Sequence, residues 1–231
     1  PEKVVKEAVF GSQFHTICSG GAYLNPDYIE LFERFGIQIL QGYGMTECSP
    51  VISTTVAWNV KKNSVGQLLP NCEAKTVDGE LWVRGSSVMQ GYYKMPEETK
   101  TALKDGWLCT GDLGYVDEER FIYLTGRKKN LIITKNGENV SPEELENKLS
   151  SSRLVQEVLV REAKGVIEAE IYPDEEYAKK QGLEREEEVR VELQKLIDEY
   201  NQGAPAYKKI YSLIIREKEF EKTASRKIKR Y

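Results

Sequence analysis

Two kinds of apolar pattern alternate over residues 1–60. Apolar side chains recur at helical spacing in two segments, and the second segment begins with a cap residue and an early proline at Asn25-Pro26. Two short apolar runs are typical of buried strands. The expected order is helix 3–10, strand 14–18, helix 27–35 and strand 37–40, followed at once by a loop at Gly42-Tyr43-Gly44. This alternation predicts an α/β fold.

The pattern changes at about residue 61, where short strand-like runs alternate with turn signals. Only one short helical segment, residues 96–103, interrupts them. The clearest strand-like runs are residues 73–77, 80–84, 113–116 and 121–124. This pattern predicts a small antiparallel sheet that resembles a barrel over residues 61–128.

A third pattern, of mixed helices and strands, begins near Lys129. Ser141 and Pro142 predict a helix start, with Ser141 as the N-cap. A long charged helix is expected at residues 185–201. Its apolar stripe consists of Val189, Leu193, Leu196 and Ile197. Strands are expected at residues 131–134, 155–161, 165–172 and 210–215. Residues 129–231 therefore read as a small α+β domain.

Composition narrows the class of protein. The 231 residues are 40% hydrophobic and 30% charged with a net charge of -4, which fits a globular protein without the basic face that nucleic-acid binding needs. None of the four cysteines forms a CxxC pair, so we expect reduced thiols and a cytoplasmic location. No signal peptide is visible, and no apolar run approaches the length of a transmembrane segment.

Four local motifs occur in a fixed order along the chain. They are residues 42–47 (GYGMTE), residues 106–112 (GWLCTGD), residues 126–129 (GRKK) followed by 136–140 (NGENV), and residues 222–228 (KTASRKI). In this order they resemble the adenylate-forming (AMP-binding) superfamily, with long-chain fatty acyl-CoA synthetases as the closest members. The resemblance covers essentially all of the chain. It implies that residues 1–128 end a large AMP-binding domain and that residues 129–231 form a small mobile domain.

The first motif combines groups that suit a nucleotide. Gly42 and Gly44 allow the backbone to approach a ligand closely, and Tyr43 offers a flat face to a purine. Thr46 offers a hydroxyl to a phosphate, and Glu47 offers a hard oxygen ligand for Mg²⁺. The resemblance implies adenine stacking, phosphate contact and metal binding for these residues. Taken alone, the motif is equally well a turn with a packed tyrosine.

Further nucleotide contacts follow from the resemblance. The segment Gly20-Gly21-Ala22 corresponds to one that borders the adenine and the acyl pocket, although Gly-Gly is also a common tight turn. Asp112 corresponds to the aspartate that accepts hydrogen bonds from two ribose hydroxyls, which an ionised carboxylate can do. Arg127 corresponds to a second contact to ribose or phosphate, and its planar guanidinium suits such oxygens.

The small domain carries the remaining candidates. Lys129 stands at the family's hinge between the two domains, or is an ordinary surface lysine. Lys227 corresponds to the catalytic lysine that stabilises charge on the α-phosphate and pyrophosphate. Arg226 precedes it where the family usually has glycine. Gly137 and Glu138 resemble the loop that helps form the coenzyme A channel during thioester formation.

The resemblance implies an acid–thiol ligase that uses ATP and Mg²⁺ to activate a carboxylic acid and transfers it from acyl-AMP to coenzyme A, and we expect the acid to be a fatty acid. It also allows a peripheral membrane contact in the full-length enzyme. The family's Gly/Ser/Thr-rich phosphate loop is missing from the 231 residues, so we expect a fragment that is weak or inactive alone. A peptide-synthetase-type adenylation domain and a non-catalytic nucleotide-binding module remain as alternatives.

Overall fold

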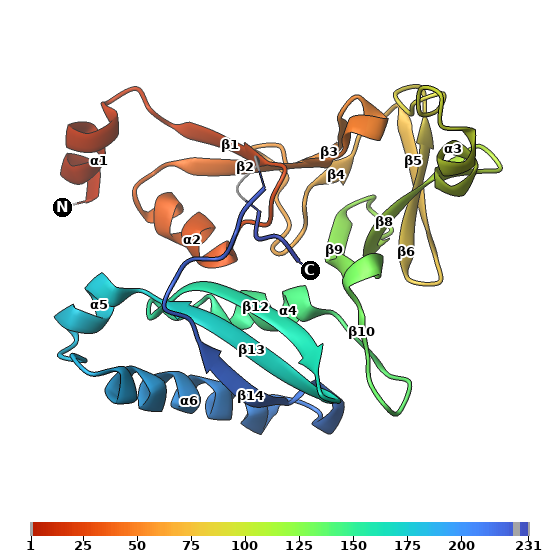
Figure 1. Ribbon diagram of the computed structural model, residues 1–231. Coiled ribbons are helices and arrows are strands. Elements are labelled where there is room, and N and C mark those ends of the chain that lie inside the picture. Colours follow the sequence, from red (N-terminus) through yellow and green to blue (C-terminus); the bar gives the residue numbers. More distant parts are fainter. Residues whose placement is uncertain (1, 224–226, 231) are drawn as a thin grey trace. The chain divides into compact units, whose positions relative to one another are not determined.

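The computed structural model describes residues 2–223 and 227–230 (Figure 1). Contacts divide the chain into two units, Pro1–Lys128 and Lys129–Tyr231. Each unit has its own hydrophobic core.

The first unit begins with a four-stranded sheet in the order β1-β2-β3-β4. Strands β1 and β2 are parallel, whereas β3 and β4 join in antiparallel fashion. The Asn25 side chain accepts a hydrogen bond from the Asp27 backbone at 2.9 Å, so the predicted cap is formed. The elements are α1 (Glu2–Phe10), β1 (Thr16–Gly20), α2 (Pro26–Arg34), β2 (Gln38–Gly44), η1 (Thr46–Cys48), β3 (Val51–Thr54) and β4 (Gln67–Leu68).

The prediction of a loop at Gly42-Tyr43-Gly44 is wrong, because these residues are the last three of strand β2. They pair with β3, where Gly42 lies opposite Thr54 and Tyr43 lies opposite Ser53. Glycines in a run usually indicate a turn, but the backbone partners of β3 extend the strand. The candidate motif is therefore held by a sheet and not by a free loop.

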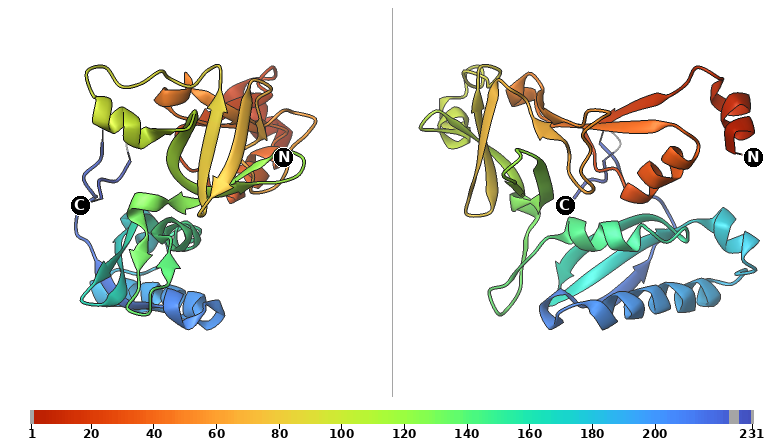
Figure 2. Two further views of the ribbon diagram at one scale, coloured as in Figure 1. Left: turned by 90° about the vertical axis from the view of Figure 1, so that its right-hand side faces the viewer. Right: turned by 180° about the vertical axis from the view of Figure 1, so that it is seen from behind.

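The second sheet of this unit is antiparallel, as predicted. Its order is β5-β6-β8-β7, and β9 also pairs with β8. A tight turn at Asp78-Gly79, with both φ angles positive, joins the first two strands. The sheet curls but does not close (Figure 2). Its elements are β5 (Cys72–Val77), β6 (Glu80–Gly85), α3 (Pro96–Ala102), β7 (Leu103–Lys104), β8 (Trp107–Val116) and β9 (Ile122–Arg127).

One core connects the two sheets of the first unit. It contains Tyr43 and Ile52 from the first sheet together with Leu81, Val83 and Leu108 from the second. The alternation of buried and less buried positions along β8 follows from the two faces of a strand. The sheets are thus packed as one body, which fixes the ends of β2 and β8 relative to each other.

The second unit is an α+β structure. Its main sheet has the order β12-β13-β14, in which β13 is antiparallel to β12 and parallel to β14. Helix α4 packs on β12, α6 packs on β14, and the two helices contact each other. The elements are η2 (Lys128–Asn130), β10 (Ile132–Ile133), β11 (Asn139–Val140), α4 (Pro142–Leu149), β12 (Val155–Ala163), β13 (Val166–Pro173), α5 (Glu175–Lys180), α6 (Glu186–Gly203), η3 (Ala206–Lys208) and β14 (Ile210–Ile215).

The predicted apolar stripe of the long helix is confirmed. Val189, Leu193 and Ile197 are buried, and Leu196 packs against the same core. Ser141 occupies the N-cap position of α4, but its hydroxyl bonds to Glu143 Oε2 at 2.9 Å and not to the helix backbone. No helix within residues 2–223 and 227–230 is both long and apolar enough to cross a membrane.

The core of the second unit can be tested at Leu193, which is fully buried in α6. Leu193→Ala should lower the free energy of unfolding of this unit by about 2–5 kcal/mol, because it removes buried methyl groups and leaves a cavity. All three tryptophans lie in the first unit, so urea unfolding should be followed by far-UV circular dichroism of the helices. Val191→Ala, at a 46% exposed position of the same helix, is the matched control and should change the value little.

Candidate active site

A buried hydrogen bond joins the first motif to the second. The hydroxyl of Tyr43, at the end of β2, donates to Asp112 Oδ2 on β8 at 2.6 Å. Tyr43 is 9% exposed and Asp112 is 5% exposed. The two residues are 69 positions apart in the sequence, and the packing of the two sheets brings them together.

Arg127, the last residue of β9, also contacts Asp112. Tyr43, Asp112 and Arg127 thus form one cluster. Its Nε lies 2.6 Å from Asp112 Oδ1, so the carboxylate is held by a cation on one oxygen and by a hydroxyl on the other. Burial, together with the neighbouring Asp112 charge and hydrogen bond, raises the pKa of Tyr43 far above its ordinary value. Tyr43 therefore stays a hydrogen-bond donor, and Asp112 has the partners that a buried carboxylate needs.

This arrangement bears on the expected role of Tyr43. Its ring belongs to the core of the first unit, and its hydroxyl is fixed on Asp112. In this structure the Tyr43 hydroxyl therefore orients the Asp112 carboxylate. Stacking of its ring on a purine stays a prediction.

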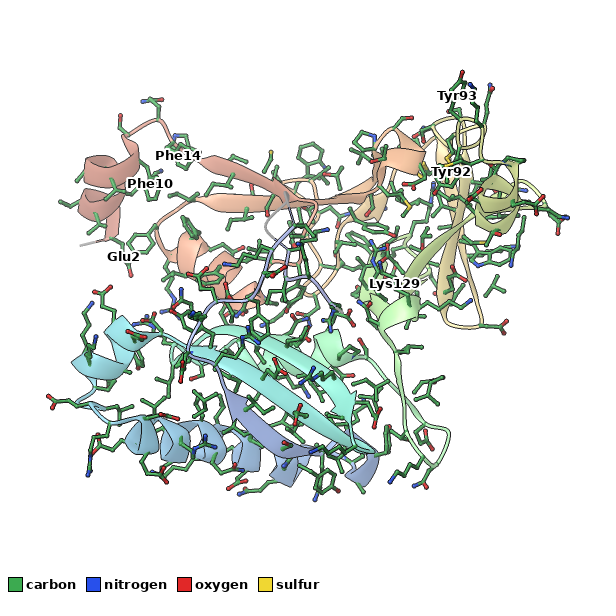
Figure 3. The ribbon with its side chains drawn as sticks, viewed as in Figure 1. Glu2, Phe10, Phe14, Tyr92, Tyr93 and Lys129 are labelled. Carbon is green, nitrogen blue, oxygen red and sulfur yellow. The ribbon has the colours of Figure 1, made fainter. Side chains whose placement is uncertain are left out.

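Glu47 lies in η1, one residue after the exposed Thr46. Its Oε1 accepts a hydrogen bond from the Tyr92 hydroxyl at 2.7 Å, which raises the pKa of Tyr92 to about 12. Tyr92 lies beside α3, where its backbone donates to Thr99 (Figure 3). Tyr92 thus holds Glu47 in place and stays protonated at neutral pH.

The described residues contain no group of three or more His, Cys, Asp or Glu side chains that could cage a metal ion. Mg²⁺ does not require such a cage, because it is commonly held by one or two carboxylates together with substrate phosphates and water. Glu47 is a partly exposed oxygen ligand of this kind beside an exposed hydroxyl. The residues therefore fit a magnesium ion that arrives with a nucleotide.

The glycine-rich candidates lie side by side. Gly20, the last residue of β1, is opposite Gly42 in the parallel register. A Cβ at Gly20 would lie 2.9 Å from the Gly42 carbonyl oxygen, and a Cβ at Gly44 would lie 1.9 Å from the Pro50 carbonyl oxygen. Both positions require glycine on packing grounds. Gly21 and Ala22 follow β1 and are exposed.

An open cleft of about 600 Å³ lies along β8 and α3, but Tyr43, Asp112 and Arg127 do not line it. Thr110 and Gly111, which directly precede Asp112, form part of its wall, and Tyr92 forms another part. The charged residues that line the cleft are Glu80, Glu97, Glu98, Lys104 and Lys128.

The candidates of the second unit lie in three separate segments. Gly137 and Glu138 are exposed in the turn between β10 and β11, where Gly137 has a φ of 80°. Lys227 is exposed, and its carbonyl accepts a hydrogen bond from the Thr223 backbone N–H at 2.8 Å beside an antiparallel bridge between Lys222 and Ile228. Arg226 lies outside the described residues. Lys129 is exposed in the middle of η2, which follows β9 (Figure 3).

Two residues of the site were not predicted from the sequence. Tyr92 holds Glu47, and the buried Glu80 accepts hydrogen bonds from the Gly111 backbone and from Lys128, each at 2.9 Å. Burial opposes ionisation of Glu80, but Lys128 and the Gly111 N–H outweigh it and lower the pKa of this carboxyl. Nothing in the local sequence marks either residue, except that Glu80 follows a predicted turn.

Comparison with known families accounts for most of the chain. The model of the AMP-binding enzyme family matches residues 2–93, and that of the AMP-binding enzyme C-terminal domain matches residues 129–231. The chain belongs to the AMP-binding enzyme family. This confirms the resemblance drawn from the four motifs, and it agrees with the α/β, curled-sheet and α+β parts of the fold.

Individual AMP-binding enzymes support this assignment. The long-chain-fatty-acid–CoA ligase of Mycobacterium bovis is 39% identical over 171 residues, which cover 73% of this chain and 28% of that enzyme. The long-chain-fatty-acid–CoA ligase of Bacillus subtilis is 38% identical over 163 residues, which cover 64% of this chain and 29% of that enzyme. The chain thus spans less than a third of the length of these curated relatives.

Solved AMP-binding enzymes share the fold. The o-succinylbenzoate CoA synthetase (MenE) of Bacillus subtilis, in complex with the acyl-adenylate intermediate OSB-AMP, has a TM-score of 0.77 and 30% sequence identity. The alignment covers 92% of this chain and 44% of that enzyme. The same synthetase has also been solved with ATP and a magnesium ion.

Tyr43→Phe tests the contact between the two sheets of the first unit. The variant removes the hydroxyl that bonds to Asp112 and should lower the free energy of unfolding by about 1.5–3 kcal/mol, because a buried charged acceptor loses a partner. Tryptophan fluorescence during urea unfolding reports on this unit alone. Tyr115→Phe, at a 50% exposed position, is the matched control. Equal effects of the two substitutions would show that the buried hydroxyl has no special role.

Proposed function

We propose that this chain forms part of the active site of an ATP-dependent acid–CoA ligase that activates a carboxylic acid, preferably a fatty acid, as acyl-AMP. The observation that carries the proposal is the buried contact of Tyr43, Asp112 and Arg127, which brings together residues from three of the motifs. The fatty-acid preference is supported by relatives named as long-chain-fatty-acid–CoA ligases.

In this proposal, the first unit binds the nucleotide. Asp112 accepts hydrogen bonds from the ribose hydroxyls, with Tyr43 and Arg127 fixing its orientation. Arg127 also offers its guanidinium to ribose or phosphate oxygens. Thr46 contacts a phosphate through its exposed hydroxyl. The segment that begins at Gly20 borders the adenine and the acyl group.

Glu47 has a separate role in the same unit. Its carboxylate would hold Mg²⁺, and Tyr92 keeps that carboxylate in a fixed position. When bound, the metal ion neutralises charge on the phosphates of ATP. The relative solved with ATP and magnesium supports this role.

Lys227 supplies positive charge for the first half-reaction. Attack by the substrate carboxylate on the α-phosphate forms the acyl–phosphate bond and breaks the bond to pyrophosphate. Negative charge builds up on the phosphate oxygens and on the departing pyrophosphate, and a lysine ammonium stabilises both. The exposed position of Lys227 suits a side chain that enters another unit's site.

The second half-reaction requires a different surface of the second unit. We propose that a rotation at Lys129 withdraws Lys227 and brings in the turn of Gly137 and Glu138, which helps form the channel for coenzyme A. The thiol then attacks the acyl carbonyl and releases AMP. Relatives named as CoA ligases favour coenzyme A over a carrier protein as the acceptor.

The isolated chain should bind AMP but should not catalyse ATP–pyrophosphate exchange, because its sequence contains no Gly/Ser/Thr-rich loop for the β- and γ-phosphates. Titration with AMP, followed by amide NMR, should shift the signals of Gly111, Asp112 and Glu47. Asp112→Asn should weaken the binding, and Asp78→Asn, in an exposed turn of the same unit, should not. Exchange activity in the isolated chain, or AMP shifts elsewhere, would contradict the proposal.

Lys227→Ala, introduced into a ligase that spans the length of the relatives, should slow acyl-adenylate formation by roughly 100-fold or more. Thioester formation from preformed acyl-AMP should change by only a few-fold, because Lys227 has left the site in that step. Lys229→Ala is the matched control, since Lys229 is an exposed lysine two residues further along the chain that pairs with Glu221. A similar loss in both half-reactions would argue against the assigned role.

A further inference from the structure

The residue directly before Lys129 is anchored within the first unit. Lys128 Nζ lies 2.9 Å from Glu80 Oε2, and the Glu80 side chain is only 7% exposed. The other oxygen of Glu80 accepts the Gly111 backbone N–H at 2.9 Å. One buried carboxylate therefore connects the end of this unit to the residue that precedes Asp112.

The residue directly after Lys129 is anchored within the second unit. Asn130 Nδ2 donates to Glu143 Oε1, in the first turn of α4, at 2.5 Å. Arg230 Nη2 lies 3.6 Å from the same oxygen and also pairs with Glu146. Glu143 therefore connects the start of this unit to the segment that follows Lys227.

Lys129 differs from both of its neighbours. It is exposed, and its side chain makes no hydrogen bond or ion pair to any residue within 2–223 and 227–230. Its φ and ψ angles can change without breaking a side-chain contact of its own. Rotation at Lys128 or Asn130 would instead pull a side chain away from its carboxylate partner.

We propose that Glu80 and Glu143 are positioning residues that confine the rotation between the two units to the backbone of Lys129. The inference rests on the proposed two-step function, which needs such a rotation. Each carboxylate ties the residue next to the pivot to the segment that carries its own unit's reactive group, namely Asp112 or Lys227. A turn about one residue then moves each reactive group together with its whole unit.

Nitrogen-15 relaxation of the 231-residue chain, without nucleotide, tests this directly. In the wild-type chain the order parameters of the Lys128 and Asn130 amides should be about 0.85, as in rigid backbone. Lys128→Met should lower the value at residue 128 below about 0.6, and Asn130→Ala should do the same at residue 130. Lys128→Arg, which keeps the ion pair, should restore the wild-type value. Glu80→Gln gives an independent test of the first anchor.

Lys61→Met is the matched control, because it removes an ion pair with Asp117 in the same unit and should leave residues 128–130 unchanged. Wild-type values at residues 128 and 130 that are already low, or that do not respond to the substitutions, would overturn the proposal. The measurement needs no catalysis. AMP titration of the same samples separately tests the proposed function, so a failure of either idea can be recognised.

Discussion

The hydrogen bond between Tyr43 and Asp112 is the contact on which the candidate site depends. It connects the end of β2 to β8, and Arg127 extends it to β9. A buried carboxylate is stable only when its charge is compensated and its oxygens are hydrogen-bonded. Asp112 therefore has the observed orientation only when the two sheets are packed together. Folding of the first unit also forms the candidate site.

The other acidic residues of the candidate site are also held by hydrogen-bond donors. Glu47 is held by Tyr92, and Glu80 is held by Lys128 and the Gly111 backbone. Glu47 belongs to a motif and is held by Tyr92 from outside the motifs, whereas Glu80 lies outside the motifs and is held by donors from two of them, Gly111 and Lys128. Residues of the motifs therefore also orient one another, and Tyr92 adds a contact from outside them.

Sequence reasoning reached the fold and the family because both depend on local signals. Apolar spacing located α6 and its stripe of Val189, Leu193 and Ile197, and the ordered motifs identified the family. Sequence reasoning failed where the backbone conformation depends on pairing with another strand. The Gly42-Tyr43-Gly44 segment looked like a loop, but pairing with β3 makes it a strand. Tyr92 and Glu80 were missed because their partners lie 45 or 31 residues away in the sequence.

Separate cores in the two units make the proposed mechanism physically reasonable. Since Leu193 and Ile197 pack within the second unit and Ile52 and Leu108 within the first, a rotation at Lys129 need not disturb either core. The cation that stabilises a leaving pyrophosphate would obstruct an incoming thiol if it stayed in place. In the proposed mechanism, a rigid unit that turns about one residue would resolve this conflict, because it would exchange Lys227 for Gly137 without loosening the proposed nucleotide contacts of Asp112. The precision of that exchange would depend on how few residues rotate, and for this reason the proposed anchors on either side of Lys129 would matter more than the length of the connection.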